Sequence, residues 1–345
     1  MRIFCTEKGE NESMKNSVRF CAGLLGIQML LLCAFPGCCM AEERPDILIG
    51  IAWGPNPNSE IYPYVTETLD DMNIAYVRLE QVTLDTIPYA GTRLSDECTA
   101  KDGYLLEEYA QRVKALPFER SNVASVMENI DGVIFMGGED ISPTLYKTPE
   151  AWHGIEAEAD YNAARDISDY ILASYCIERD IPVLGICRGN QVIGVCSGAA
   201  MIQDIPTWLA GQGLTYDETH RSAKTVPEAS RDFASHTVEI TDKDSALYDI
   251  VGDTVLEGAP SWHHQNILSV DGTALKVIGV TKTCGLDMIE AVQRTDKSFI
   301  LGVQFHPEAA VAKNLRGEKN ASDYMSKELA EKIFARLCDE CRMHN

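Results

Sequence analysis

The sequence predicts an α/β fold in which helices cover both faces of a mostly parallel sheet. Short apolar runs, such as 46–52 and 131–136, have the composition of buried parallel strands. Stretches with apolar residues at helical spacing alternate with these runs. Gly137, Cys187 and His306 lie close behind predicted strands. Because ligands bind such sheets beyond the carboxyl ends of the strands, we expect the chemistry there.

The elements are predicted in the following order. Strands are expected at 46–52, 74–79, 131–136, 182–186, 236–240, 276–281, 287–292 and 299–304. Helices are expected at 60–72, at 156–179, directly after Cys187 and from Ser322 to about Leu337. The core face of the long second helix would carry Ala163, Ile167, Tyr170, Ile171 and Ser174. Residues 83–120 predict an insertion or a lid-like excursion, and 201–235 predict a loop-rich stretch.

The N-terminus predicts export. A short basic segment from Met14, about fifteen mostly apolar residues and small residues near Ala41 follow the order of a secretory signal peptide. Cleavage after Ala41, lipid attachment at Cys38 or Cys39, and an uncleaved anchor are alternatives. We therefore expect an extension and signal over residues 1–41, one globular domain over 42–345, and a periplasmic, extracellular or lipid-anchored protein.

Composition narrows the classes of partner. The chain is 45% hydrophobic and 24% charged, as in ordinary globular proteins. Its formal net charge of −22 would repel phosphate backbones, which argues against nucleic-acid binding. Seven of the twelve cysteines lie after the predicted signal, so at least one thiol is expected to be unpaired within the chain.

The first chemical motif is Gly185-Ile186-Cys187-Arg188-Gly189. An apolar strand leads into a tight turn and a helix, which is the nucleophile-elbow pattern with cysteine as the nucleophile. The flanking glycines allow close backbone approach, and the helix directs its positive end at the sulfur, which favours the thiolate.

The second motif, Gln304-Phe305-His306-Pro307-Glu308, follows the strand 299–304. A thiol nucleophile needs a base, and the base needs an orienting partner. His306 and Glu308 lie two residues apart and face the same side if the chain stays extended, which Pro307 encourages at His306.

The third motif is Gly137-Gly138-Glu139-Asp140. Two glycines after a strand let backbone N–H groups face a ligand. The N–H groups of Gly138 and Arg188 are therefore candidates for an oxyanion hole.

Together these motifs resemble the γ-glutamyl-γ-aminobutyrate hydrolase family, which is class I glutamine-amidotransferase-like and is also classed as peptidase C26. The resemblance covers roughly residues 46–338 and adds several segments to the motifs above. These are Ile141-Ser142-Pro143, Arg165-Asp166, Asn190-Gln191, Gln203-Asp204-Ile205-Pro206 and Ser261-Trp262-His263-His264-Gln265.

The resemblance implies a flavodoxin-like three-layer sandwich and a catalytic triad of Cys187, His306 and Glu308. It implies hydrolysis of a γ-glutamyl amide to glutamate and an amine, through a thioester on Cys187 and without metal or organic cofactor. Gln191, His263, His264 and Gln265 are candidate substrate-binding residues. The stretch Val195-Cys196-Ser197-Gly198, the long 83–120 segment and the export signal depart from the family pattern and leave the amine half open.

Other interpretations of three segments remain. His263 and His264 could ligate a metal with His306 and Glu308, but adjacent histidines on a strand point to opposite faces, which favours a pocket-lining role. Cys338-Asp339-Glu340-Cys341 predicts a local disulfide or free thiols rather than a redox site. Arg165 and Asp166 form a surface pair or serve a structural or substrate-side role.

Three functions are compatible with these motifs. The favoured one is a stand-alone γ-glutamyl hydrolase that acts on a small substrate. The alternatives are a glutaminase subunit that passes ammonia to a synthase, and a catalytically silent binding protein on the same fold. A homodimer is the expected oligomer, and membrane attachment is expected only through the N-terminal segment.

Overall fold

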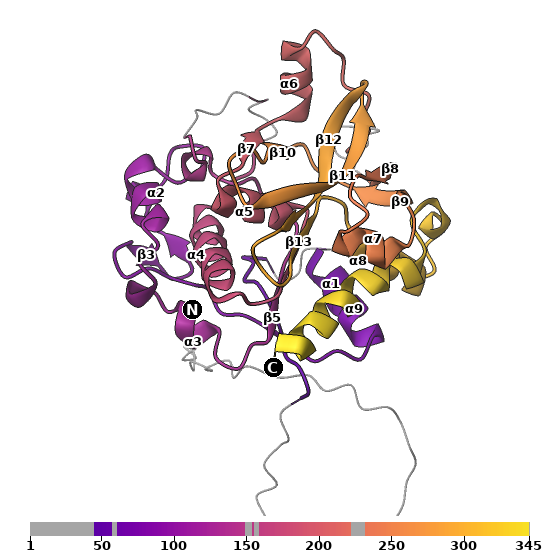
Figure 1. Cartoon of the computed structure of the whole chain (residues 1–345). Coiled ribbons are helices and arrows are strands. Elements are labelled where there is room, and N and C mark those ends of the chain that lie inside the picture. Colours follow the sequence, from indigo (N-terminus) through magenta and orange to yellow (C-terminus); the bar gives the residue numbers. More distant parts are fainter. Residues whose placement is uncertain (1–44, 57–60, 149–153, 155–158, 222–231, 345) are drawn as a thin grey trace, which may run out of the picture.

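The computed structural model describes residues 45–56, 61–148, 154, 159–221 and 232–344. Its centre is a nine-stranded sheet (Figure 1). In spatial order the strands are β2 (Tyr76–Arg78), β1 (Ile49–Ile51), β5 (Gly132–Phe135), β6 (Val183–Ile186), β13 (Ile300–Val303), β12 (Leu286–Arg294), β11 (Leu275–Thr283), β8 (Ala234–Ile240) and β9 (Val255–Ser261). Neighbouring strands pair in parallel from β2 to β13 and antiparallel from β13 to β9.

Helices cover the two faces of the sheet and create two hydrophobic cores. One core includes residues of α1 (Ile61–Asp71), α7 (Ala246–Val251), α8 (Pro307–Leu315) and α9 (Lys327–His344). The other includes residues of α2 (Glu107–Lys114), α3 (Val123–Val126), α4 (Ala163–Arg179) and α5 (Arg188–Ser197). The three-layer α/β fold predicted from the sequence is therefore confirmed.

Smaller elements stand outside this framework. The strands β3 (Tyr89–Ala90) and β4 (Arg93–Leu94) form a short hairpin, and β7 (Ala200–Ile202) pairs with β10 (Asn266–Ser269). The helix α6 (Ile205–Gly211) projects at the top of Figure 1 and packs near β12 through a third small apolar cluster. Residues 201–221 are thus more regular than the loop-rich prediction.

The buried strands form where the sequence is apolar on both faces. Every residue of β5 and β6 is buried, as expected for strands covered by helices on two sides. The predicted strands and the helices at 60–72 and after Cys187 are all present. The strands β9 and β10 and the helices α7 and α8 were not predicted.

Two predicted helix starts are wrong. The long helix α4 begins at Ala163 rather than at 156, because the side chain of Asn162 caps it by accepting from the N–H of Arg165. The closing helix α9 begins at Lys327 rather than Ser322 and continues to His344.

The segment 83–120 is packed into the protein rather than placed over the site. Leu84, Ile87, Leu105 and Val113 are buried in the same core as α4. No residue of this segment is among the described residues that line the central cleft. These contacts favour the insertion interpretation over the lid.

The predicted export segment and the boundary at residue 42 lie outside the described residues. Among the helices that the structure describes, none is both long and apolar enough to cross a bilayer.

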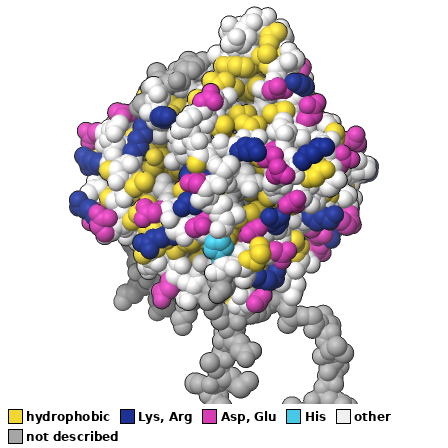
Figure 2. Space-filling view, viewed as in Figure 1, with side chains coloured by type: hydrophobic (Ala, Val, Ile, Leu, Met, Phe, Trp, Pro, Cys, Tyr) yellow, Lys and Arg dark blue, Asp and Glu magenta, His cyan; other side chains and the backbone are white. Residues whose placement is uncertain are grey.

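Acidic and basic side chains are interspersed on the face shown in Figure 2. That face carries no continuous basic field.

Candidate active site

Cys187 lies in a strained turn between β6 and α5. Its φ of 51° and ψ of −104° are unusual for a residue with a side chain. The backbone N–H of Cys187 donates to the carbonyl of Val303 at 2.8 Å, which anchors the turn to the end of β13. The predicted nucleophile elbow is present, with the sulfur at the N-terminus of a ten-residue helix.

The flanking glycines have the predicted steric reason. A Cβ at Gly185 would lie 2.6 Å from the carbonyl carbon of Gly189, and one at Gly189 would collide with the backbone oxygen of Phe135. Neither position can hold a side chain without moving backbone, so glycine is required on both sides of the nucleophile.

His306 and Glu308 are in contact with each other close to the turn at Cys187. Nδ1 of His306 lies 2.6 Å from Oε1 of Glu308, and both side chains are buried. The pair does not lie on extended chain as predicted: His306 is the N-cap of α8, and Glu308 belongs to the first turn of that helix. The helical turn brings the carboxylate beneath the ring, and Pro307 occupies the first helical position, which suits proline.

The electrostatics favour a protonated imidazole. Burial alone would lower the pKa of His306, but the charges of Glu308 and Cys187 raise it to about 10. At neutral pH the ring therefore carries both protons, with Nδ1–H donating to Glu308 and the other available to the sulfur side.

A cleft of about 290 Å³ opens beside the sulfur. Its size suits a small molecule of amino-acid dimensions. The lining residues are Gly138, Glu139, Asp140, Ala159, Asp160, Cys187, Gln191, Arg221, Trp262, His263, His264 and Gln265. All four predicted substrate-binding residues are in this set, together with Asp160 and Arg221, which the sequence did not indicate.

The predicted oxyanion-hole residues border the nucleophile from two elements. Gly138 follows β5, lines the cleft and has a φ of +148°, a conformation in which a side chain would be strained. Arg188 is the first residue of α5, so its N–H lacks a partner one turn earlier in the helix. Both N–H groups belong to segments that adjoin Cys187.

A buried ionic network supports the floor of this site. The side chain of Arg188 bonds Asp166 and Asp169, and that of Arg165 bonds Glu139. Burial raises the pKa of Glu139, but the two arginines outweigh it and hold the pKa below its usual value. Arg165 and Asp166 are only 4% and 2% exposed, so the surface-pair interpretation is wrong, and the structural or substrate-side role stays a prediction.

The two adjacent histidines diverge. His264 lies between Asp140, at 2.9 Å, and Asp204, at 3.0 Å. Burial lowers the pKa of His264, yet the two carboxylates raise it to about 9, so the ring is cationic. His263 points away from this pair, its Nδ1 lies 2.9 Å from the carbonyl of Gln265, and burial lowers its pKa to about 4.

The seven described cysteines are all free. Cys338 and Cys341 are buried within α9, which agrees with plain thiols rather than a local disulfide.

A second polar cluster was missed from the sequence. His220, His236 and Glu290 are buried and close together, and His263 adjoins them. No short motif links these residues. The one available signal was a glutamate inside the apolar strand β12, because a buried carboxylate requires partners.

Fold and site together define an α/β protein with a cysteine at a nucleophile elbow and a histidine–glutamate pair beside it. The profile of the peptidase C26 family matches residues 98–308, which is more than half of the chain and includes all three of these residues. The chain belongs to the peptidase C26 family, a family of hydrolases.

Several known proteins are similar to this chain. Protein NtpR of Enterococcus hirae is 32% identical over 205 residues, which is 58% of this chain and 76% of that protein. The gamma-glutamyl-gamma-aminobutyrate hydrolase of Escherichia coli O157:H7 is 26% identical over 231 residues, covering 66% of this chain and 78% of the enzyme.

Solved structures are more distant. The glutaminase domain of Trypanosoma brucei CTPS with bound acivicin aligns over 85% of this chain and 94% of that domain, at 14% identity and a TM-score of 0.45. A TM-score at this level carries no weight for function.

Proposed function

We propose that this protein hydrolyses γ-glutamyl amides to glutamate and a free amine through a thioester on Cys187. The observation that carries the proposal is the placement of Cys187, at a strained elbow, next to the buried His306–Glu308 pair in a cleft of amino-acid size. The similarity to a γ-glutamyl-γ-aminobutyrate hydrolase supports the substrate class.

In the proposed reaction the thiolate of Cys187 attacks the side-chain carbonyl carbon of the γ-glutamyl group. The N–H groups of Gly138 and Arg188 would stabilise the oxyanion. His306, protonated at neutral pH, would give its proton to the departing amine nitrogen as the C–N bond breaks. The same imidazole would then take a proton from water, which attacks the thioester and releases glutamate and the thiolate.

Glu308 would position the base without touching the substrate. Its carboxylate accepts the Nδ1 proton of His306, so it holds the ring orientation and stabilises the imidazolium.

The charges around the cleft suit the free glutamate end of such a substrate. Glu139 and Asp160 provide carboxylates for an α-ammonium group, and Arg221 and the cationic His264 provide positive charge for an α-carboxylate. In this proposal Gln191 and Gln265 supply the neutral polar contacts of the wall.

The test is a panel of γ-glutamyl amides, with glutamine included, in which released glutamate is measured for wild type and Cys187→Ala. We expect release from at least one γ-glutamyl amide and loss of that release in the variant. Release that persists in Cys187→Ala would overturn the nucleophile. Turnover of glutamine alone would favour a glutaminase, and no turnover of any compound would favour a binding protein.

We also propose that the protein is exported, on the basis of residues 14–41. Mass measurement of the mature N-terminus in the native host tests this. Cleavage near Ala41 or a lipidated Cys38 or Cys39 would support export, and an intact Met1 or Met14 on protein recovered from the cytoplasm would contradict it.

A further inference from the structure

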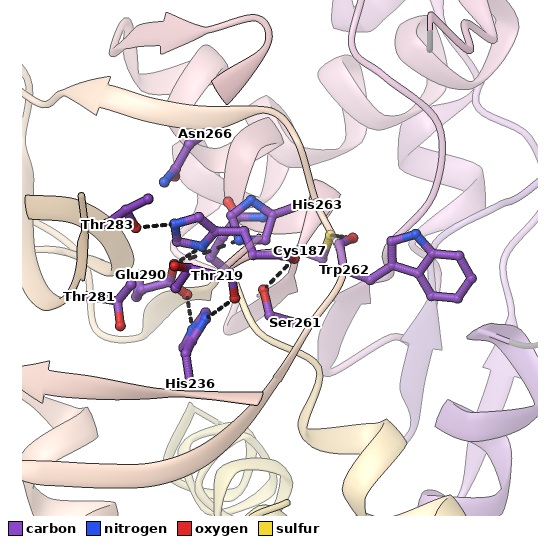
Figure 3. A network of polar contacts seen from close by, with 12 residues as sticks. Cys187, Thr219, His236, Ser261, Trp262, His263, Asn266, Thr281, Thr283 and Glu290 are labelled. Atoms are coloured by element: carbon purple, nitrogen blue, oxygen red, sulfur yellow. Dashed lines mark hydrogen bonds and ion pairs between the residues drawn. The ribbon is translucent and has the colours of Figure 1, made fainter. Parts of the chain in front are cut away.

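A second group of buried titratable side chains lies behind the cleft wall, and the proposed hydrolysis makes no use of its chemistry. His236 comes from β8, Glu290 from β12 and His263 from a connecting segment (Figure 3). His220 comes from another connecting segment. His220 and Glu290 are fully buried, and His236 and His263 are 9% and 4% exposed. We call these four residues the Glu290 cluster.

The inner nitrogen of each histidine approaches the carboxylate of Glu290. Nδ1 of His220 lies 3.2 Å from Oε1, Nε2 of His236 lies 3.2 Å from Oε2, and Nε2 of His263 lies 3.6 Å from Oε1. Despite these distances, none of the three nitrogens and neither oxygen has a partner with hydrogen-bond geometry among the described residues. The nitrogens and oxygens are within ion-pair distance of one another, but these pairs fall short of regular hydrogen bonds.

The outer nitrogens determine where the protons are. Nδ1 of His236 lies 3.1 Å from the carbonyl of Thr219, and Nδ1 of His263 lies 2.9 Å from the carbonyl of Gln265. A carbonyl oxygen only accepts hydrogen bonds, so each of these outer nitrogens carries a proton. In a neutral ring the inner nitrogen then presents a lone pair to the cluster.

His220 is held in a comparable way. Its Nε2 lies 2.6 Å from the hydroxyl of Thr283, which can accept the proton of this outer nitrogen. Thr283 and His236 approach the cluster from different sides in Figure 3. Outer-nitrogen bonds to carbonyls and hydroxyls are the arrangement that orients histidines when they ligate metals.

No protonation state of the three rings satisfies all the inner nitrogens and the carboxylate of Glu290. Three neutral rings would direct lone pairs at a buried carboxylate, which is unfavourable in a dry interior. Protonating one ring would pair it with the carboxylate but leave the inner lone pairs of the other two rings without a donor. Protonating all three would place cations side by side, because the ring centre of His220 lies 5.3 Å from that of His236 and 4.7 Å from that of His263. A single divalent cation satisfies all the inner atoms at once.

We propose that His220, His236 and Glu290 bind one divalent transition-metal ion, for which Zn²⁺ is the best fit, with His263 beside the fourth coordination position. The three ligand atoms lie within 4.8 Å of one another. Bonds of roughly 2.0–2.1 Å in a tetrahedron place ligand atoms about 3.3 Å apart. This is close to the 3.2 Å that separates each oxygen of Glu290 from its nearest ring nitrogen, Oε1 from His220 and Oε2 from His236. Imidazole nitrogen with one carboxylate suits zinc, whereas calcium and magnesium prefer oxygen.

This site differs from the one considered from the sequence. His263 contributes, but His264, His306 and Glu308 do not, and three of the four cluster residues lie in other segments. The sequence expectation of no metal is replaced by this proposal.

The ion would act on structure rather than on the reaction. The carbonyl of His220 accepts from the N–H of His263 at 3.1 Å and from the hydroxyl of Ser261 at 2.9 Å. Trp262, which lies between Ser261 and His263 in the sequence, lines the cleft. Its carbonyl oxygen lies 3.8 Å from the sulfur of Cys187. A metal at the Glu290 cluster would therefore hold the wall that faces the nucleophile.

The test is metal content measured on the purified protein, freed of any affinity tag, after removal of metal with a chelator and titration with ZnCl₂. We expect one zinc per chain and a rise in Tm of several degrees, because an ion that binds only the folded state stabilises it. His236→Asn and Glu290→Gln should weaken zinc binding by at least about 100-fold. His344→Asn, which changes a histidine at the end of α9, is the matched control and should keep full binding.

Cobalt provides a measurement that does not depend on folding of the variants. Co²⁺ bound to wild type should give visible bands of a nitrogen and oxygen site without thiolate charge-transfer absorption. Cys187→Ser should bind the same amount of zinc. Less than about 0.1 zinc per chain in wild type, a thiolate band, or unchanged binding in a folded His236→Asn would overturn the proposal.

Discussion

Two buried histidine–carboxylate groups lie near the cleft, and they differ in the number of rings per carboxylate. Glu308 contacts one imidazole and accepts a hydrogen bond from its Nδ1–H at 2.6 Å. Glu290 is approached by three imidazoles at 3.2–3.6 Å without hydrogen-bond geometry. In the first group, the carboxylate orients a single ring that can transfer protons. In the second group, the carboxylate and the three rings point potential metal ligands at one place.

The outer contacts explain the difference. Nδ1 of His306 is taken by the carboxylate itself, so the proton on the other nitrogen faces the sulfur of Cys187. In the Glu290 cluster the outer nitrogens are taken by Thr219, Gln265 and Thr283, so the lone pairs face inward. The same two residue types thus support opposite uses, according to which ring nitrogen is bonded to a partner outside the group and which faces inward.

The largest expected effect is the loss of kcat when the nucleophile or its base is replaced. Cys187→Ser should reduce kcat on the best γ-glutamyl amide by 10⁴-fold or more, an order-of-magnitude estimate based on nucleophile removal in other triads. The physical reason is that an alcohol loses its proton far less readily than a thiol. His306→Ala should have a comparable effect. Steady-state release of glutamate measures both, and near-normal activity in either variant would contradict the assignment.

Exchanging each carboxylate for its amide tests the comparison directly. Glu308→Gln should lower kcat by roughly 10²-fold, because the base loses its orienting charge, with less effect on zinc content. Glu290→Gln should lower the free energy of unfolding by about 3–5 kcal/mol, because it breaks a buried charged cluster. Denaturant unfolding, zinc content and kcat are measured on both variants. If the two substitutions have the same profile, the proposed division of roles is wrong.

A smaller effect is expected from moving the catalytic ring alone. A Cβ at Gly137 would lie 2.8 Å from Cε1 of His306, and its other near contact is with Cys187 rather than with the Glu290 cluster. Gly137→Ala should therefore lower kcat by about 10- to 100-fold through misplacement of the base, while zinc binding stays at one per chain. Gly211→Ala, where a Cβ meets nothing within 4 Å, is the control. Equal activity in the two variants would contradict the close placement of His306.

The smallest effect is a shift in pH dependence. Burial would lower the pKa of His306, but Glu308 and Cys187 raise it from 6.5 to about 10, so the protonated ring is lost as pH rises through about 10. Its contribution to stability is present in full below about 6.5 and disappears over the same rise. The alkaline limb of kcat/KM should lie near pH 10 and move down by at least about one unit in Glu308→Gln. A limb that stays in place would show that another group controls it.

Most of the predicted site rests on short-range sequence patterns. Gly185, Cys187 and Gly189 are adjacent to one apolar strand, and His306 and Glu308 are two residues apart. The nucleophile and its base could therefore be predicted without knowledge of tertiary contacts. The helix starts at Ala163 and Lys327 were misplaced because the true cap at Asn162 competes with other polar residues before it. Residues 83–120 were ambiguous because their burial depends on contact with α4, which sequence periodicity does not record.

The sequence by itself determined the class of fold, the elbow at Cys187, the His306–Glu308 pair and four residues of the cleft wall. The fold class, the elbow and the pair follow from local backbone requirements and from strands that end at one edge of a parallel sheet, whereas the four wall residues were implied by the family resemblance. Only the tertiary structure decided that His220, His236, His263 and Glu290 meet. They come from four separate segments, and pairing of β8, β11 and β12 with the intervening connections is what brings their nitrogens to one carboxylate.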